Sequence, residues 1–171
     1  MLESEKREFI LRRPRLEDAP WIWRLVRETG VLDENSSYVY LLLCRDFADT
    51  CLVAERDSQL AGFVTAYRLP LRTDVLFVWQ IGVSSMARRQ GLGLRMLTEL
   101  ISRCRDENDG GVSFVEATVA LSNEPSQRLF KSLAARLEAQ LVHGEGFLET
   151  DFRFGNHEAE PLIRIGPIGD N

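Results

Sequence analysis

The residues whose types and spacing best suit a chemical role form a short basic segment rich in glycine, Arg88–Gly93. It follows an apolar run, Val75–Val83, and precedes a predicted helix. Gly91 and Gly93 have no side chain, so their backbone N–H groups can approach a bulky anion closely. The helix directs its own unpaired N–H groups and the positive end of its dipole at the same place. Because the arginines add fork-shaped donors, we predict that the segment cradles a pyrophosphate at a strand–loop–helix junction.

Two familiar phosphate-binding loops do not fit this segment. A dinucleotide-binding fingerprint needs a third glycine at the position where the chain has Met96. A P-loop needs Gly-Lys followed by Ser or Thr, and none follows here. The alternative without a ligand is a tight strand-to-helix turn that carries two surface arginines.

A second group of polar residues lies immediately before a strongly apolar run. Carboxylate, amide and phenol groups gather there in Asp33, Asn35 and Tyr38. Helix capping and aromatic packing account for the neighbouring serines, but less well for so many different polar groups. We therefore expect a substrate-binding role for these three residues.

The elements that must position these groups follow from apolar periodicity and from turn residues. Strands are expected at 9–12, 50–55, 60–67, 75–83 and 112–119, and helices at about 18–30, 35–47, 91–106 and 123–134. Residues 137–142 and 148–154 are weaker strand candidates for a closing antiparallel hairpin, and the polarity of the tail after 155 fits a solvated end. The strand–helix–strand order over 75–119 predicts a right-handed crossover between parallel strands.

The composition is that of a soluble globular protein, with 171 residues of which 44% are hydrophobic and 27% charged. This length suits one domain with a real core, so we expect residues 1–171 to form a single domain. The net charge of −5 argues against a nucleic-acid partner and is compatible with a basic substrate.

The three cysteines, Cys44, Cys51 and Cys104, are odd in number and lack metal-ligand spacing, which predicts reduced cytosolic thiols and no metal. The N-terminus is too charged for a secretory signal, and no apolar run reaches membrane-spanning length. We therefore expect a cytoplasmic protein with no membrane partner.

The pattern Arg-x-x-Gly-x-Gly at 88–93 and the order of the elements resemble the GNAT superfamily of N-acetyltransferases along nearly the whole chain. Asn123-x-x-Ser126 followed by Leu129-Phe130 is similar to the second cofactor motif of that family. The resemblance implies an α/β fold, the GNAT fold, with a mixed, centrally splayed β-sheet flanked by helices on both faces. It also implies acetyl-CoA as the co-substrate.

In this family the loop amides hold the pyrophosphate of coenzyme A, and the residue at the position of Asn123 binds the pantetheine arm. Backbone amides near Ile81–Val83 would pair with the pantetheine, and one of them could hydrogen-bond the thioester carbonyl as an oxyanion hole. The resemblance implies these cofactor-binding residues: Ile81, Val83, Arg88, Arg89, Gln90, Gly91, Leu92, Gly93, Asn123, Ser126 and Phe130.

One departure from the family concerns Phe130, where many members carry a tyrosine that is thought to protonate the leaving thiolate. Phenylalanine cannot donate a proton. Tyr38 and Tyr40 are the candidate acids, and solvent is the alternative. Because a coenzyme A thiolate is a reasonable leaving group, this departure need not abolish turnover.

An amine nucleophile also needs a proton acceptor, because a primary ammonium has a pKa near 10 and is inert until deprotonated. Glu116, on the strand beside the expected thioester, is the first candidate for this general base, and His157 is the second. The alternatives without catalysis are a structural carboxylate at Glu116 and a surface side chain at His157.

Five further segments resemble a narrower family, the L-2,4-diaminobutyrate acetyltransferases of ectoine biosynthesis. They are Leu-Asp-x-Asn-Ser-x-Tyr at 32–38, Tyr-Leu-Leu-Leu-Cys at 40–44, Phe-Val-Trp-Gln at 77–80, His-Glu-x-Glu at 157–160 and Arg-Ile-Gly-Pro at 164–167. The resemblance implies acetyl transfer from acetyl-CoA to the γ-amine of diaminobutyrate, whose product a separate synthase cyclises to ectoine. It also implies a cytoplasmic, homodimeric bacterial enzyme.

This substrate, with two ammonium groups and one carboxylate, gives the polar residues a purpose. Asp33, Glu116, Glu158 and Glu160 could supply negative charge, and Asn35, Tyr38 and Gln80 could orient the ammonium groups. Trp79 could wall the aliphatic chain or face a cation. Adjacent strand residues point to opposite faces, so one of Trp79 and Gln80 is expected to be structural. Arg72 is a guess for the carboxylate.

Two other functions remain open from the sequence. The same fold could acetylate another small amine or a protein N-terminus, although the polar residues at 33–40 favour a small charged acceptor. A non-catalytic acyl-CoA-binding module is the third possibility, and Phe130 is the feature that favours it.

Overall fold

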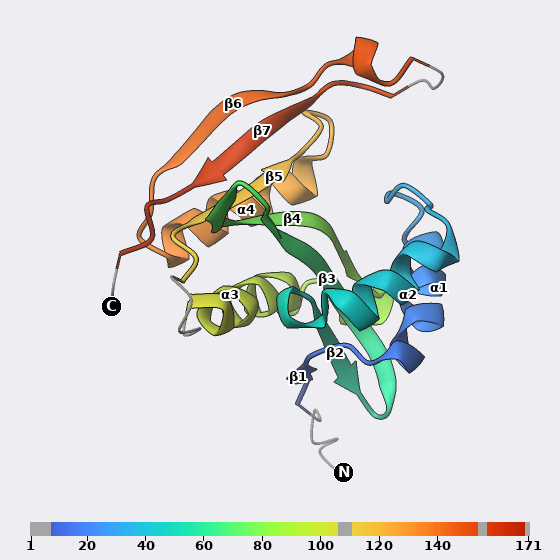
Figure 1. The fold of residues 1–171 in the computed structure, drawn as a ribbon. Coiled ribbons are helices and arrows are strands. Elements are labelled where there is room, and N and C mark those ends of the chain that lie inside the picture. Colours follow the sequence, from blue (N-terminus) through green and yellow to red (C-terminus); the bar gives the residue numbers. More distant parts are fainter. Residues whose placement is uncertain (1–7, 106–110, 154–156, 170–171) are drawn as a thin grey trace. The chain divides into compact units, whose positions relative to one another are not determined.

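The computed structural model describes residues 8–105, 111–153 and 157–169, which form seven β-strands and four α-helices (Figure 1). The strands are β1 (Ile10–Arg12), β2 (Leu52–Arg56), β3 (Gln59–Leu69), β4 (Arg72–Val83), β5 (Phe114–Thr118), β6 (Leu141–Phe147) and β7 (Glu160–Ile165). The helices are α1 (Ala19–Thr29), α2 (Ser37–Asp46), α3 (Leu92–Arg105) and α4 (Glu124–Arg136). No helix among the described residues is both long and apolar enough to cross a membrane.

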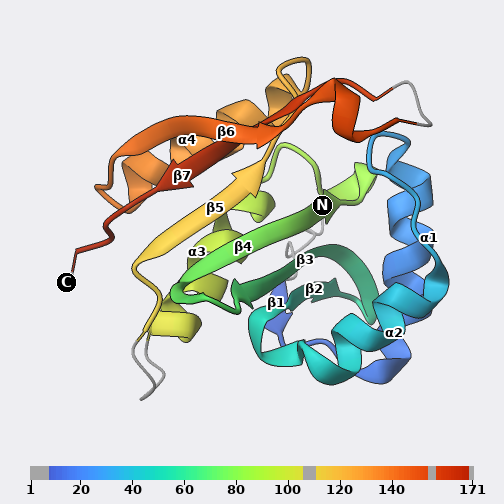
Figure 2. The ribbon, with the colours of Figure 1, turned by 45° about the horizontal axis from the view of Figure 1, so that its top comes forward.

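The strands follow the order β1-β2-β3-β4-β5-β7-β6 in one mixed sheet (Figure 2). Strands β4 and β5 are parallel and pair Val75–Phe77 with Phe114–Glu116, whereas β1–β2, β2–β3, β5–β7 and β6–β7 are antiparallel. The predicted parallel pair is therefore confirmed, with α3 in the connection that parallel strands require.

The chain divides into two compact units. The first unit contains the described parts of 1–65 and 80–100, and the second contains those of 66–79 and 101–171. Strands β3 and β4 and helix α3 each continue from one unit into the other.

In the first unit, α1 and α2 bury apolar residues against β2 and β3. Ile22, Leu25 and Val26 recur at helical spacing on α1 and pack in one cluster with Tyr40 and Phe63. The helix begins after Asp18, with Pro20 in its first turn, and ends at Gly30, whose φ of 65° gives the left-handed conformation that glycine favours. The predicted bounds of α1 are thus confirmed.

Two helix starts refine the capping predictions. The Asp18 side chain does not cap α1, since its carboxylate accepts two hydrogen bonds from Arg12 at 2.7 and 3.0 Å and one from the Arg15 backbone. The N-cap of α2 is Ser36, whose hydroxyl accepts from the Tyr38 amide. Asn35, the other residue whose type suits a cap at this helix start, does not fill that position.

Gly62 lies at an irregularity in β3, which we expect of a glycine inside a strand. The β2–β3 register shifts between Ala54 and Glu55, which pair with Gly62 and Leu60 respectively. A Cβ at position 62 would lie 2.9 Å from the terminal methyl of Met96 on α3 and 3.0 Å from the Gly82 carbonyl oxygen, so glycine suits this close approach.

In the second unit, β5 alternates between two environments. Val115 and Ala117 are buried and pair in register with the buried Ile165 and Ile163 of β7, so these four side chains share one side of the sheet. Glu116 points to the opposite side and pairs in register with Arg164.

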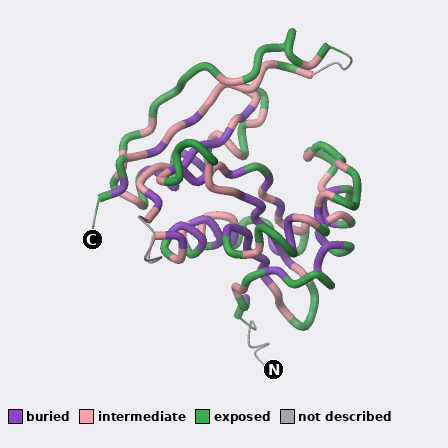
Figure 3. The backbone as a smooth tube through the Cα atoms, viewed as in Figure 1, coloured by how far each residue is buried: buried purple, intermediate pink, exposed green. Residues whose placement is uncertain are grey.

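The prediction for the closing hairpin was wrong at its second strand, and its first strand, 137–142, overlaps β6 only at residues 141–142. Residues 149–151 form a 3-10 turn, residue 154 lies outside the described residues, and the partner of β6 is β7 in the expected solvated tail. Ile163 and Ile165 are buried in that tail, whereas β6 is mostly exposed (Figure 3). An exposed edge strand containing two glycines carries little of the alternation by which strands are recognised.

Candidate functional site

The predicted Arg88–Gly93 segment consists of an exposed turn, Arg88–Gly91, and the first two residues of α3, Leu92 and Gly93. Arg89 and Gly91 adopt positive φ angles of 60° and 70°, and Arg88 through Gly91 are exposed to solvent. The first α3 hydrogen bond that follows the turn runs from the Arg95 amide to the Gly91 carbonyl, at 3.1 Å. The amides of the preceding helical turn therefore have no carbonyl of their own helix to bind. An accessible turn before such amides has the features that the predicted pyrophosphate site requires.

Gln90 braces this turn through its side chain. Its amide nitrogen donates to the Met86 carbonyl at 2.9 Å, and its amide oxygen accepts from Arg56 at 3.2 Å. Leu92 is buried and anchors the start of α3. The side chain of Gln90 thus shapes the turn, and its backbone is the part left for a ligand.

The end of β4 presents backbone amides in two directions. The amides of Gln80 and Ser84 bond to Thr65 and Ala61 of β3, at 3.2 and 2.8 Å. Because amide directions alternate along a strand, those of Ile81 and Val83 point to the other edge of β4. This is the orientation that the predicted pairing with an extended ligand requires.

The start of α4 uses the second predicted cofactor motif for capping. The Asn123 side-chain oxygen accepts from the Ser126 amide at 3.2 Å, so Asn123 is the N-cap of α4. Phe130 is buried in the second unit and has no hydroxyl to offer.

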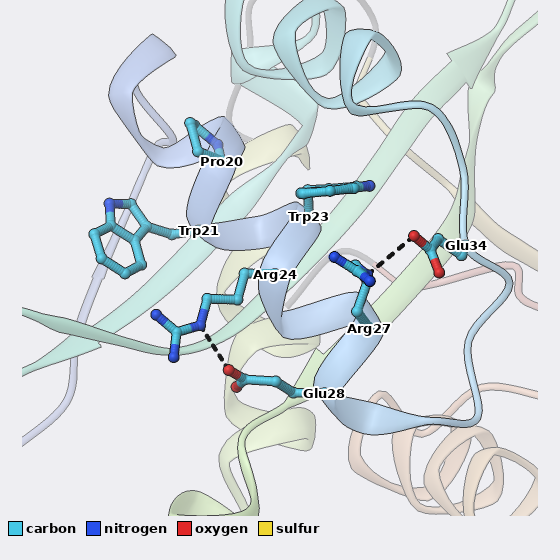
Figure 4. Close-up of a pocket in the computed structure, with 7 residues that line it drawn as sticks. All are labelled: Pro20, Trp21, Trp23, Arg24, Arg27, Glu28 and Glu34. Carbon is cyan, nitrogen blue, oxygen red and sulfur yellow. Dashed lines mark hydrogen bonds and ion pairs between the residues drawn. The ribbon is translucent and has the colours of Figure 1, made fainter.

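The loop between α1 and α2 holds the predicted substrate residues. Asp33 and Tyr38 are exposed, and the Asn35 side chain donates to the Asp33 carbonyl at 3.1 Å. Trp23 and Arg27 of α1 fasten the loop, because the Trp23 indole donates to the Asn35 carbonyl at 3.1 Å and Arg27 pairs with Glu34 (Figure 4).

Figure 4 shows a shallow hollow on the surface of α1 beside this loop. It is lined by Pro20, Trp21, Trp23, Arg24, Arg27, Glu28 and Glu34. Each of its two arginines lies over a tryptophan ring and forms an ion pair with one of the two glutamates. The charged groups of the hollow are thus already paired within it.

Gln80 and Trp79 point to opposite faces of β4, and they differ in their exposure to solvent. Gln80 is 6% exposed, and its side-chain oxygen accepts from the Tyr40 hydroxyl at 2.9 Å. Its side-chain nitrogen donates to the Asp33 carbonyl at 3.0 Å. Trp79 is 36% exposed. Gln80 is therefore the structural member of this pair, and its side-chain amide is engaged by Tyr40 and Asp33.

Tyr40 is fully buried, and burial raises the pKa of its phenol above the usual value. It therefore remains a donor to Gln80 at neutral pH. Tyr38, by contrast, is 62% exposed, so of the two candidate acids it is the one open to solvent.

Glu116 is 2% exposed and bound by two arginines. Arg72 donates to both of its oxygens, at 2.9 and 3.0 Å, and Arg164 donates to one of them. The Arg164 guanidinium also lies 3.9 Å from the Phe114 ring centre. These contacts agree with the structural alternative for Glu116, since a base must have an oxygen available to a proton. They also engage Arg72, the guess for the substrate carboxylate.

His157 has defined contacts at both ring nitrogens. Nδ1 lies 2.9 Å from the Glu158 carbonyl, and Nε2 lies 3.6 Å from a Glu160 carboxylate oxygen. Because a carbonyl only accepts, Nδ1 carries the hydrogen and Nε2 is the nitrogen that can take up a proton. Phe152 stacks on the ring at 4.1 Å.

Sequence reasoning missed the residues that support these groups. The Thr118 hydroxyl donates to Glu160 at 2.7 Å, and the Ser122 hydroxyl donates to Glu158. Arg164 lies in the segment 164–167, which resembles the diaminobutyrate acetyltransferases, but the sequence suggested no role for it. The position of Thr118 two residues after Glu116, on the same strand face, is the signal that was available.

A model of the acetyltransferase (GNAT) family matches residues 11–135. With the mixed sheet and the strand–loop–helix turn, this match defines the class: the chain belongs to the GNAT acetyltransferases, and the predicted fold is confirmed.

Among curated relatives, the L-2,4-diaminobutyric acid acetyltransferase of Halalkalibacterium halodurans is 47% identical over 91% of this chain and 80% of that protein. The protein of the same name from Marinococcus halophilus is 44% identical over 91% of this chain and 88% of its own length. A solved structure, diaminobutyrate acetyltransferase EctA from Paenibacillus lautus in complex with its substrate L-2,4-diaminobutyric acid and coenzyme A, superposes with a TM-score of 0.88 and 41% identity, covering 96% of this chain and 98% of that one. Within the GNAT class, the chain belongs to the L-2,4-diaminobutyric acid acetyltransferase family.

Proposed function

We propose that this protein transfers the acetyl group of acetyl-CoA to the γ-amino group of L-2,4-diaminobutyrate. The product is Nγ-acetyl-diaminobutyrate, the precursor of the compatible solute ectoine. The observation that carries the proposal is the similarity, over more than nine-tenths of the chain, to proteins named for this reaction.

The turn at Arg88–Gly93 and the first amides of α3 would hold the pyrophosphate of acetyl-CoA. Arg88 and Arg89 add charge-assisted donors, and Asn123 and Ser126 are proposed for the pantetheine arm. The co-substrate supplies an acyl carbon activated as a thioester. The amide of Ile81 or Val83 would donate to the carbonyl oxygen as negative charge develops there, which is the largest catalytic contribution in many acyl transfers.

The acceptor amine must lose a proton before its nitrogen attacks the carbonyl carbon and the carbon–sulfur bond breaks. We assign this proton to Nε2 of His157, because Nδ1 is held as a donor and both oxygens of Glu116 are engaged by arginine. The thiolate leaves with the bonding electrons and takes a proton from Tyr38 or from solvent.

The acceptor's charges and chain would meet different groups. Asp33 and Glu158 attract the ammonium groups, Asn35 and Tyr38 orient them, and Trp79 covers the aliphatic chain. The exposure of Asp33, Tyr38 and Trp79 supports this assignment.

We further propose that the enzyme acts in the cytoplasm as a homodimer, without a metal, a nucleic acid or a membrane. Cys44, Cys51 and Cys104 are buried, and none of them forms a disulfide within the part of the chain that the structure describes. Such protected thiols suit a reducing compartment.

The function is tested by incubating the protein with acetyl-CoA and a panel of amines. The panel contains L-2,4-diaminobutyrate, ornithine, lysine, a polyamine and a peptide N-terminus. We expect release of the coenzyme A thiol in proportion to acetylated diaminobutyrate, identified by mass spectrometry. Transfer to a different amine in preference would replace the acceptor but keep the enzyme class.

One specific observation favours a second function, acyl-CoA binding without catalysis. Phe130 stands at the family's usual tyrosine position, and its buried ring has no proton to give. Tight acetyl-CoA binding with no transfer to any member of the panel would establish this function and overturn the first.

A further inference from the structure

The carbonyl of Asp33 is the best-anchored point of the α1–α2 loop. It accepts one hydrogen bond from Gln80 at 3.0 Å and another from Asn35 at 3.1 Å. A carbonyl oxygen has two lone pairs, so both of its acceptor positions are used. Asp33 is itself an exposed residue.

Gln80, the donor from β4, is held in place by hydrogen bonds to both its side chain and its backbone. The Gln80 side chain accepts from the buried Tyr40 hydroxyl at 2.9 Å, and the Gln80 backbone exchanges hydrogen bonds with Thr65 at 3.2 and 3.3 Å. Because Tyr40 donates to the amide oxygen, the Gln80 amide nitrogen must face the loop. The phenol thus sets the orientation of the amide.

The opposite side of the loop is fastened to α1. Trp23 donates to the Asn35 carbonyl, and Arg27 pairs with Glu34 at 3.1 Å (Figure 4). These contacts hold the loop to α1, whereas the contact with Gln80 holds it to β4.

We propose that Gln80 and Tyr40 are positioning residues that set how far the Asp33 carboxylate lies from the end of β4. Gln80 directly precedes Ile81, whose amide is one of the two proposed for the acyl carbonyl, so one residue joins the acceptor loop to the strand that would present the acetyl carbon. The inference rests on the proposed function, because it assigns substrate roles to Asp33 and Ile81.

The connection between Asp33 and β4 through Gln80 should control selectivity for the length of the acceptor's carbon chain. An ammonium group held by Asp33 places the second amine at a reach fixed by the carbon chain between them. Ornithine is one methylene longer than diaminobutyrate, and a displacement of about 1 Å can cost roughly 100-fold in rate. A loosened loop should therefore bind diaminobutyrate less well and discriminate less against ornithine.

The test compares Tyr40→Phe and Gln80→Met with the wild type. Tyr40→Phe removes one oxygen and keeps the buried ring, and Gln80→Met keeps the length but removes both polar atoms. Tyr67→Phe, on β3, is the control for loss of a phenol hydroxyl, and Gln59→Met, at an exposed end of β3, is the control for loss of an amide.

We expect about a fivefold rise in the KM for diaminobutyrate in Tyr40→Phe, the size expected from one buried hydrogen bond. The rise should be larger in Gln80→Met, which loses the hydrogen bonds to both Tyr40 and Asp33. The ratio of kcat/KM for diaminobutyrate over ornithine should fall by a similar factor. The KM for acetyl-CoA should stay unchanged, and both controls should behave as the wild type does. A parallel rise in both KM values with a lower Tm would indicate a general structural role and overturn the inference.

Unchanged acceptor KM and unchanged selectivity in Tyr40→Phe would also overturn it. If the wild type transfers acetyl to no amine, the proposed function fails separately. The inference is then decided by calorimetric binding of diaminobutyrate in the presence of coenzyme A, which should be about fivefold weaker in Tyr40→Phe. Equal affinities would reject it.

Discussion

His157 is the residue at which the reaction is most sharply testable. We predict that His157→Gln lowers kcat by about 100-fold, because it removes the group that accepts the ammonium proton. The chain has one other histidine, His143, on the exposed strand β6, and His143→Gln is the matched control. Stopped-flow or steady-state rates at saturating substrates measure the effect, and equal kcat values for the two variants would exclude His157 as the base.

Glu116 should behave differently, since its contacts are structural. We predict that Glu116→Gln lowers the free energy of unfolding by about 2 kcal/mol, because two guanidinium groups lose their carboxylate. Its kcat should remain near that of the wild type. Urea titration and kinetic assays of the same preparation measure both quantities. A loss of about 100-fold in kcat at unchanged stability would instead return Glu116 to the role of base.

Glu116 and Gln80 show which properties of single residues can be predicted from the sequence and which cannot. A buried strand position was visible for both, and the opposite directions of Trp79 and Gln80 followed from the strand period. The partners were not visible, because Arg72 and Arg164 lie 44 and 48 residues from Glu116 and Tyr40 lies 40 residues from Gln80. Only the folded sheet decides which side chains meet across such separations.

At the scale of elements, the turn before α3 makes the cofactor assignment testable. Gly91 has a φ of 70° and no atom within 4 Å of an added Cβ, so alanine there is strained by its backbone and not by a clash. We predict that Gly91→Ala raises the KM for acetyl-CoA about tenfold, since a displaced amide loses a hydrogen bond to a charged group. The stability cost should be about 1 kcal/mol.

Gly30 provides the control for this prediction. It ends α1 with a φ of 65° and also has no atom within 4 Å of an added Cβ. Gly30→Ala should cost similar stability and leave the KM for acetyl-CoA unchanged. If the two variants changed that KM equally, the effect would come from stability, and the turn would lose its assigned role.

The elements themselves were predictable where their periodicity was strong. α1 and α2 have clear caps or stops, and β4 has a continuous apolar run, so their positions follow from the sequence. The β6–β7 hairpin was misplaced because β6 is exposed and β7 follows a polar segment. Such strands are stabilised mainly by pairing with a neighbouring strand. That pairing depends on the tertiary structure and cannot be recognised from the local sequence.

At the scale of the whole molecule, we expected a single domain, and the structure divides the chain into two compact units. Strands β3 and β4 and helix α3 belong to both units, so unfolding of one unit should disrupt elements of the other. We therefore predict that the two units unfold together, in one cooperative transition.

The cysteines report on this prediction without added probes. Cys44 and Cys51 lie in the first unit and Cys104 in the second, and all three are buried. Burial raises the pKa of the Cys44 thiol to about 12, so little reactive thiolate exists at neutral pH. Labelling by a thiol reagent should therefore require unfolding, and peptide mass spectrometry across a urea series should give one midpoint for all three sites. Acetyl-CoA at about 100 times its Kd should raise that midpoint by the equivalent of about 2.7 kcal/mol at every site. A lower urea midpoint for Cys104 alone would show that the second unit unfolds before the first. The prediction of one cooperative transition would then be wrong.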